Sequence, residues 1–83
     1  MYINQFDSYN EDNLYDSYRQ IGITIQDSIQ IALSQVSGQI IKIELERKNG
    51  ILVYEVKILS PQGLIYEVEV DATTGNVVKV ELD

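Results

Sequence analysis

The residues of this chain that could carry chemistry are carboxylates. The 83-residue sequence holds 13 Asp and Glu but no Cys and no His. It therefore lacks the thiol nucleophile, the disulfide, the usual general base and the commonest transition-metal ligand. Its serines have no histidine to activate them. Glutamates recur two residues apart in several segments, and two carboxylates on one face are the catalytic groups of a glycosidase.

The segments that hold these glutamates favour a structural role for them. Glu44, Glu55, Glu67 and Glu69 alternate with apolar residues, as in strands with one buried face. We expect them on a flat, solvated face with lysines between them, where nothing raises the pKa of one carboxyl. Asp71 lacks the repeated acidic spacing of a calcium loop, and its carboxylate is expected to bond backbone N–H groups of a turn. We predict no enzyme activity, no metal site and no cofactor.

The charge balance excludes other classes of partner. Six basic against 13 acidic residues give a net charge of −7, which opposes binding to phosphate backbones or anionic lipid. We predict no nucleic-acid partner. No apolar run approaches the roughly 20 residues of a membrane span, and no leader peptide or anchor is visible in the sequence. The length fits one domain with a core of modest size.

Residues 1–20 differ in composition from the rest of the chain. They hold Tyr2, Phe6 and three further tyrosines among Asp, Asn and Ser residues, with no sustained period. We expect a flexible acidic and aromatic arm here, followed by a domain at residues 21–83. The alternative is an arm whose aromatic side chains dock on the domain or on a neighbouring molecule.

The first regular element is a helix at about residues 25–37. Thr24 fits an N-cap, and Asp27 three residues later completes a capping box. An apolar stripe at helical spacing follows, and a glycine then fits the left-handed position that ends a helix. The stripe is Ile25, Ile29, Ala32, Leu33 and Val36, and the glycine is Gly38. Ile31 points away from the stripe, into water or onto a contact partner.

Four alternating runs predict strands at about residues 39–47, 51–59, 64–71 and 76–82. The turns between them are Asn49-Gly50, Pro61-Gln62-Gly63 and Asp71 to Gly75. These turns set antiparallel registers that keep the apolar residues in phase. The expected pairs include Ile41–Ile58, Ile43–Val56, Leu45–Tyr54, Val56–Val68, Ile58–Tyr66, Val70–Val78 and Val68–Val80. The fold class is therefore α+β, a four-stranded antiparallel meander whose inner face, covered by the helix, forms the core.

The same registers give a map of the outer, open face of the sheet. Its middle rows are charged, and small apolar groups lie at both ends. Ile40, Leu59 and Ile65 fall side by side at one end, and Val53 and Val77 flank Asp71 at the other. Together with Ile31 these apolar residues are the candidate protein-contact surface. The alternative is that they are covered by the chain's own arm or tolerated singly.

From Ile23 to Asp83 the chain resembles a PepSY domain. The matching features are the helix Thr24–Val36 closed by Gly38, the strands Ile41–Glu46, Tyr54–Ile58 and Tyr66–Val70, the Asn49-Gly50 turn, and the Asp71–Gly75 turn into Val77-Val78. Ser28 stands where the family commonly has Ala. The resemblance implies a bacterial module, extracellular or at the cell surface, from a family found in metallopeptidase propeptides and as stand-alone envelope proteins that modulate peptidases. It implies no catalytic residues.

Two functions follow from these patterns. The first is a non-enzymatic module of the cell envelope that binds and modulates a protein partner, a secreted metallopeptidase, through the open sheet face or an edge strand. The alternative is a structural module that forms a homodimer through Ile31 and the arm or by edge pairing. Small-ligand binding would need a cavity that the expected core does not leave.

Overall fold

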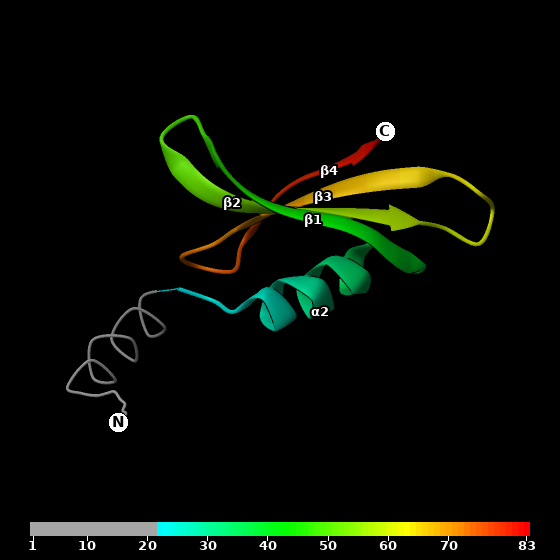
Figure 1. Cartoon of the computed structure of the whole chain (residues 1–83), viewed down its shortest axis with the longest axis horizontal. Helices are drawn as coiled ribbons and strands as arrows, with labels where there is room; N and C mark the ends of the chain where they lie inside the picture. The colour runs from blue at the N-terminus through cyan, green and yellow to red at the C-terminus, as the bar shows by residue number, and fades with distance from the viewer. Residues whose placement is uncertain (1–21) are drawn as a thin grey trace, which may run out of the picture.

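A computed structural model of the protein describes residues 22–83 (Figure 1). The elements follow in the order α2 (Ile25–Gln35), β1 (Gln39–Lys48), β2 (Ile51–Leu59), β3 (Ile65–Asp71) and β4 (Val77–Leu82). The strands form one antiparallel sheet in the order β1-β2-β3-β4, and α2 lies against one face of it (Figure 1). The predicted α+β meander is confirmed. The predicted arm at residues 1–20 lies outside the described residues.

Helix α2 begins as the sequence predicts and ends earlier. The Thr24 side chain accepts from the Asp27 N–H at 3.0 Å, and the Asp27 carboxylate accepts from the Thr24 N–H at 3.1 Å, which completes the capping box. Val36 already has an extended backbone, so Gly38 does not end the helix as expected. Gly38 is required for a different reason: a Cβ there would overlap the carbonyl oxygen of Leu59, and its φ is +152°.

The face that α2 turns to the sheet differs from the predicted stripe. Ser28 and Ala32 are fully buried, whereas Ile25 is 54% exposed. Small side chains at these two positions let the helix backbone approach the sheet closely, and the Ser28 hydroxyl donates to the Ile25 carbonyl at 2.6 Å. Ile31 does not point away as expected. It is half-buried against the core, because the long turn after β3 reaches the same side of the helix.

The first two turns set the registers that the sequence predicts. Asn49 and Gly50 both have positive φ, as a two-residue hairpin turn requires. The pairs observed across β1–β2 and β2–β3 include Leu45–Tyr54, Ile43–Val56, Val56–Val68 and Ile58–Tyr66. At the third turn, the Asp71 carboxylate accepts from the N–H groups of Thr73 and Thr74 at 2.8 and 3.1 Å, as expected for a turn-forming aspartate.

Two β-bulges on the edge strands overturn parts of the predicted map. On β1 the register shifts at Ile41, so that Ile40 rather than Ile41 pairs with Ile58. On β4 the register shifts so that Val77 rather than Val78 pairs with Val70. The third turn is one residue longer than expected, since the Asp71 N–H donates to the Asn76 carbonyl at 2.8 Å. A bulge moves a side chain to the other face, which no alternation pattern reveals.

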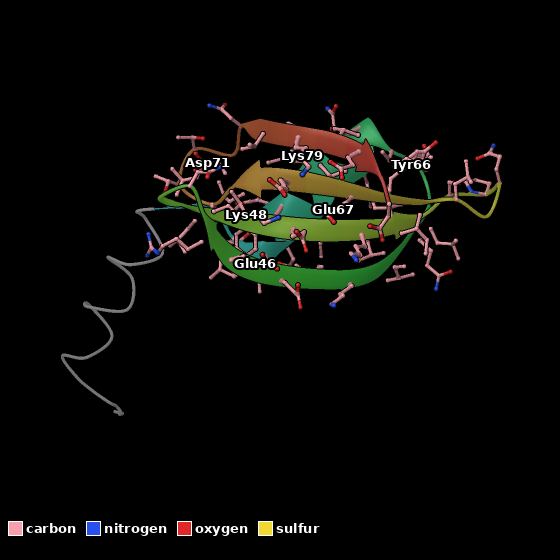
Figure 2. The ribbon with its side chains drawn as sticks, turned by 90° about the horizontal axis from the view of Figure 1, so that it is seen from above. Glu46, Lys48, Tyr66, Glu67, Asp71 and Lys79 are labelled. Carbon is pink, nitrogen blue, oxygen red and sulfur yellow. The ribbon has the colours of Figure 1, made fainter. Side chains whose placement is uncertain are left out.

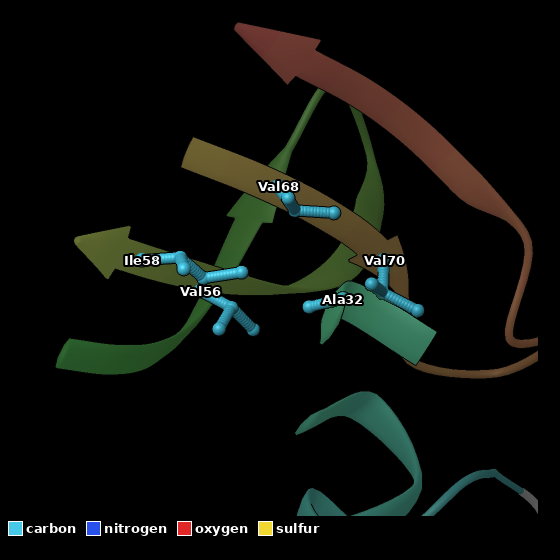
Figure 3. Packing of buried hydrophobic residues seen from close by; sticks show 5 residues of the cluster. All are labelled: Ala32, Val56, Ile58, Val68 and Val70. Atoms are coloured by element: carbon cyan, nitrogen blue, oxygen red, sulfur yellow. The ribbon is translucent and has the colours of Figure 1, made fainter. Parts of the chain in front are cut away.

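The core lies between α2 and the two central strands. Ala32, Val56, Ile58, Val68 and Val70 are fully buried and pack together (Figure 3). The predicted core also included the inner faces of the edge strands, which is correct for Ile43, half-buried against the core, and wrong for most of the others. The edge-strand residues that were predicted to face the core and are exposed are Ile41 (44%), Leu45 (55%), Val78 (48%), Val80 (46%) and Leu82 (57%). One helix about 10 Å wide covers about two strands spaced 4.8 Å apart, so much of the apolar surface of both edge strands stays exposed.

Candidate protein-binding surfaces

The residues predicted for the two ends of the open face do not all lie exposed on that face. Leu59 and Ile65 pair directly across β2 and β3 and are half-buried. Ile40 instead packs against the core on the helix side. Val77 pairs with the buried Val70, and Val53 is fully buried. A contact role for Leu59 and Ile65 stays a prediction, and the exposure expected at Val53 is wrong.

The centre of the open face holds an ion cluster around Lys48 (Figure 2). Lys48 is the last residue of β1, and its Nζ lies 2.8 Å from a Glu55 oxygen and 2.6 Å from a Glu69 oxygen. Glu67 lies within 3.8 Å of the same Nζ. The side chain thus reaches from the edge strand across β2 to β3.

Burial and hydrogen bonds shift the pKa values of carboxyl groups in this cluster. Glu55 and Glu69 are only 8% and 4% exposed. The hydrogen bond from Lys48 lowers the pKa of Glu55. Burial, followed by the hydrogen bond with Glu55, raises the pKa of Glu67 to about 7. The expectation that nothing on this face raises the pKa of a carboxyl is therefore wrong. The predicted strand pairing shows which residues are neighbours, but it does not show that Lys48 reaches carboxylates on two other strands or that these carboxylates are buried.

The carboxylates of this cluster are spaced closely enough to hold a metal ion, but the ammonium group of Lys48 lies among them. Carboxylate oxygens of Glu55, Glu67 and Glu69 lie within 4.8 Å of one another. An ammonium group among them offsets part of their mutual repulsion. The arrangement ties three strands together.

Several exposed apolar side chains lie on the helix side, at both edges of the sheet. Beside β1 there is a hollow of about 340 Å³. It is lined by Gly22, Ile23, Leu45, Leu52, Tyr54, Ala72 and Thr73. Leu45 and Leu52 are 55% and 37% exposed, so the hollow offers a mostly apolar wall next to the outer edge of β1, which pairs with no other strand of residues 22–83. The alternation in the sequence predicts Leu45 in the core. The sequence feature that could have shown otherwise is that a single short helix has to cover four strands.

The opposite edge is barer still. All six residues of β4 are exposed, and Val78, Val80 and Leu82 are each about half exposed. The hollow beside this strand has about 410 Å³. Its lining is more polar: Gln35, Val36, Ser37, Ser60, Pro61, Gln62, Tyr66 and Val80. The two edges therefore present different chemistry: an apolar hollow at β1, and a row of exposed apolar side chains beside a more polar hollow at β4.

Comparison with known proteins identifies the family. The family model described as "Peptidase propeptide and YPEB domain" (PepSY) matches residues 22–81. The chain belongs to the PepSY family. The match covers the helix, β1, β2, β3 and all but the last residue of β4, and so confirms the resemblance carried by the strand and turn motifs. No curated protein matches the chain.

Two solved structures are similar to this PepSY domain. One is the crystal structure of a "putative lipoprotein" (CD1622) from Clostridium difficile 630, with a TM-score of 0.72 and 27% identity, covering 76% of this chain and 41% of the other. The second is the YpmB protein from Bacillus subtilis, with a TM-score of 0.68 and 27% identity, covering 77% of this chain and 51% of the other. The PepSY domain thus spans about half the length of these two proteins.

Within residues 22–83, none of the helices of this PepSY domain has the length and apolar character needed to cross a membrane.

Proposed function

We propose that this PepSY domain is a non-enzymatic module, extracellular or at the cell surface, that binds and modulates a peptidase. Two observations support this proposal. The family description names peptidase propeptides, and one similar structure is described as a "putative lipoprotein", which is a class of protein anchored at the cell envelope. The partner class that fits the family is a secreted metallopeptidase.

The observation that carries the proposal is the apolar hollow beside β1, with Leu45 more than half exposed at its rim. Past the bulge at Ile41, β1 pairs regularly with β2 from Lys42 to Lys48. Its outer edge offers backbone donors and acceptors there. An extended segment of a partner can add to that edge and place a side chain in the hollow, with the backbone giving affinity and the hollow giving specificity.

The alternative surface, the open face, fits a protein partner less well. Its central carboxylates already pair with Lys48, at 2.8 Å for Glu55 and 2.6 Å for Glu69. A partner would have to break these pairs and leave buried charges uncompensated, which costs free energy. The same pairing argues against catalysis, because the two most buried carboxylates are held as ion-pair partners.

Titration calorimetry with a thermolysin-like secreted metallopeptidase tests the proposal. We expect a complex, a change in peptidase rate, and at least tenfold weaker binding for Leu45→Asp, since a central apolar anchor of an interface typically contributes more than about 1 kcal/mol. Leu64→Asp is the matched control: Leu64 is 44% exposed but lies in the turn before β3. No complex with the wild-type chain, or equal effects of the two variants, would contradict the proposal.

A further inference from the structure

Strand β4 is the last strand of the sheet, and its outer backbone edge pairs with no other strand of residues 22–83. The Asp83 N–H donates to the Ile65 carbonyl at 2.8 Å, so Asp83 turns its backbone groups toward β3. Because backbone direction alternates along an antiparallel strand, Glu81 and Lys79 also turn theirs toward β3, whereas Val80 and Leu82 direct theirs outward. Among the described residues nothing covers this edge, since all of β4 is exposed.

The side chains of β4 alternate in chemistry as well as in direction. Val80 and Leu82 lie on the helix side, 46% and 57% exposed. Lys79 and Glu81 lie on the open-face side, and their side chains are 42% and 53% exposed, with Lys79 Nζ 3.0 Å from Glu81 Oε1. A basic and an acidic residue two positions apart on one face make the strand complementary to an antiparallel copy of itself.

We propose that two copies of this chain pair antiparallel through β4, with Val80 on the two-fold axis. Lys79 then lies opposite the partner's Glu81, and Glu81 lies opposite the partner's Lys79. On the helix side Val80 meets its own copy, and Val78 meets the partner's Leu82. The outward backbone groups of Val80 form the central hydrogen-bonded pair of this register.

Charge selects this register among those that the backbone allows. Outward-facing residues must pair with outward-facing residues, so the axis can move only by whole residues along β4. An axis at Lys79 would place two lysines opposite each other, and an axis at Glu81 would place two glutamates opposite each other. Like charges directly opposite destabilise a strand pair, and opposite charges stabilise it. The axis at Val80 alone gives two attractive pairs and no repulsive one.

The resulting assembly is a continuous eight-stranded sheet with both helices on one face. It covers apolar side chains that β4 leaves bare, and it leaves the hollow beside β1 free at both outer ends. The contact is therefore separate from the proposed peptidase surface. Each copy has a net charge of −7, which opposes association at low salt, so the dimer is weak and strengthens with ionic strength.

A charge-swap experiment on the full chain tests the register. Sedimentation equilibrium is measured at 150 mM salt up to millimolar concentration for wild type, Lys79→Glu, Glu81→Lys and an equimolar mixture of the two variants. Each variant places like charges opposite each other twice, so we expect at least a tenfold weaker homodimer. In the mixture every pair is opposite in sign, so we expect heterodimers about as stable as wild type. A wild-type monomer throughout, unaffected single variants, or a mixture no tighter than its components would each overturn the proposal.

Cysteine cross-linking gives a second readout that does not depend on Lys79, whose Nζ also lies 3.7 Å from Glu69 within the fold. The chain has no cysteine, so Val80→Cys introduces a single thiol. Hydrogen-bonded partners have Cα atoms about 5.5 Å apart, which is within disulfide range. We expect oxidation to cross-link Val80→Cys but not Ile41→Cys, which is equally exposed on the other edge. Cross-linking of Ile41→Cys alone would show that the chain associates through β1 and would overturn the proposal.

Discussion

Truncating Leu45 and truncating Val56 should have different effects, because Leu45 belongs to the apolar surface and Val56 to the core. Leu45 and Val56 lie on the same face of adjacent strands, and alternation alone assigns both to the core. In the structure Leu45 is 55% exposed and Val56 is fully buried. Leu45→Ala and Val56→Ala therefore probe the same sheet face in two different environments.

The expected costs follow from these exposures. Val56→Ala deletes two methyl groups from a close-packed site and leaves a cavity, so we expect a loss of about 2 to 3 kcal/mol in the free energy of unfolding. Leu45→Ala deletes a larger group, but this group is only partly buried in the folded state. We therefore expect a loss of under about 1 kcal/mol in the free energy of unfolding. For a domain of this size the corresponding fall in Tm is roughly 10–20 °C for Val56→Ala and a few degrees for Leu45→Ala.

Circular dichroism melts of the two variants measure these losses. Calorimetry with the metallopeptidase then measures binding, where we expect the opposite order: Leu45→Ala weakens the complex at least tenfold, and Val56→Ala leaves the affinity of the folded fraction unchanged. A Leu45→Ala variant that melts as low as Val56→Ala would refute the reasoning, because it would mean that Leu45 is covered in the protein.

Three further predictions concern the ion cluster and one glycine. Glu67→Gln should make stability depend less on pH between pH 5 and pH 8. In the wild-type chain the folded pKa of Glu67 is raised to about 7, so its contribution to stability is present below the unfolded pKa and is lost as the pH rises through 7. Urea midpoints of the variant and the wild-type chain at the two pH values measure the difference. Lys48→Met should destabilise the fold more at pH 7 than at pH 4. Lys48 lowers the pKa of Glu55, and the stability that this interaction contributes is lost as the pH falls and Glu55 is protonated. An equal loss of unfolding free energy at both pH values in urea titrations would contradict this prediction. Gly38→Ala should lower Tm by more than 10 °C, because a Cβ would overlap the Leu59 carbonyl; a melt close to that of the wild-type chain would disprove the proposed role of Gly38.

The parts of the fold that the sequence predicts correctly are those set by local chemistry. Asn49-Gly50 fixes the β1–β2 register from Lys42 to Lys48, and Thr24 with Asp27 fixes the start of α2. In these segments one or two residues dictate a backbone geometry that few alternatives satisfy. The central registers follow from them, and so does the buried row of Val56, Ile58, Val68 and Val70.

The parts that the sequence does not predict depend on non-local geometry. The bulges at Ile41 and Val78 insert one residue into strands whose alternation otherwise looks perfect, and they carry Ile40 and Val77 to the other face. The reach of Lys48 across two strands depends on how the sheet curves. The bare edges depend on the width of one helix relative to four strands, a comparison between elements that no run of residues encodes.

The most direct test of the central claim is chemical-shift mapping of the ¹⁵N-labelled chain as a catalytically inactive secreted metallopeptidase is added. We predict that the amides that shift or broaden cluster along β1 and around its hollow, at Leu45, Leu52 and Tyr54, while those of Leu59 and Ile65 on the open face stay unchanged. Perturbations centred on the open face, or no perturbation at saturating peptidase, would contradict the account.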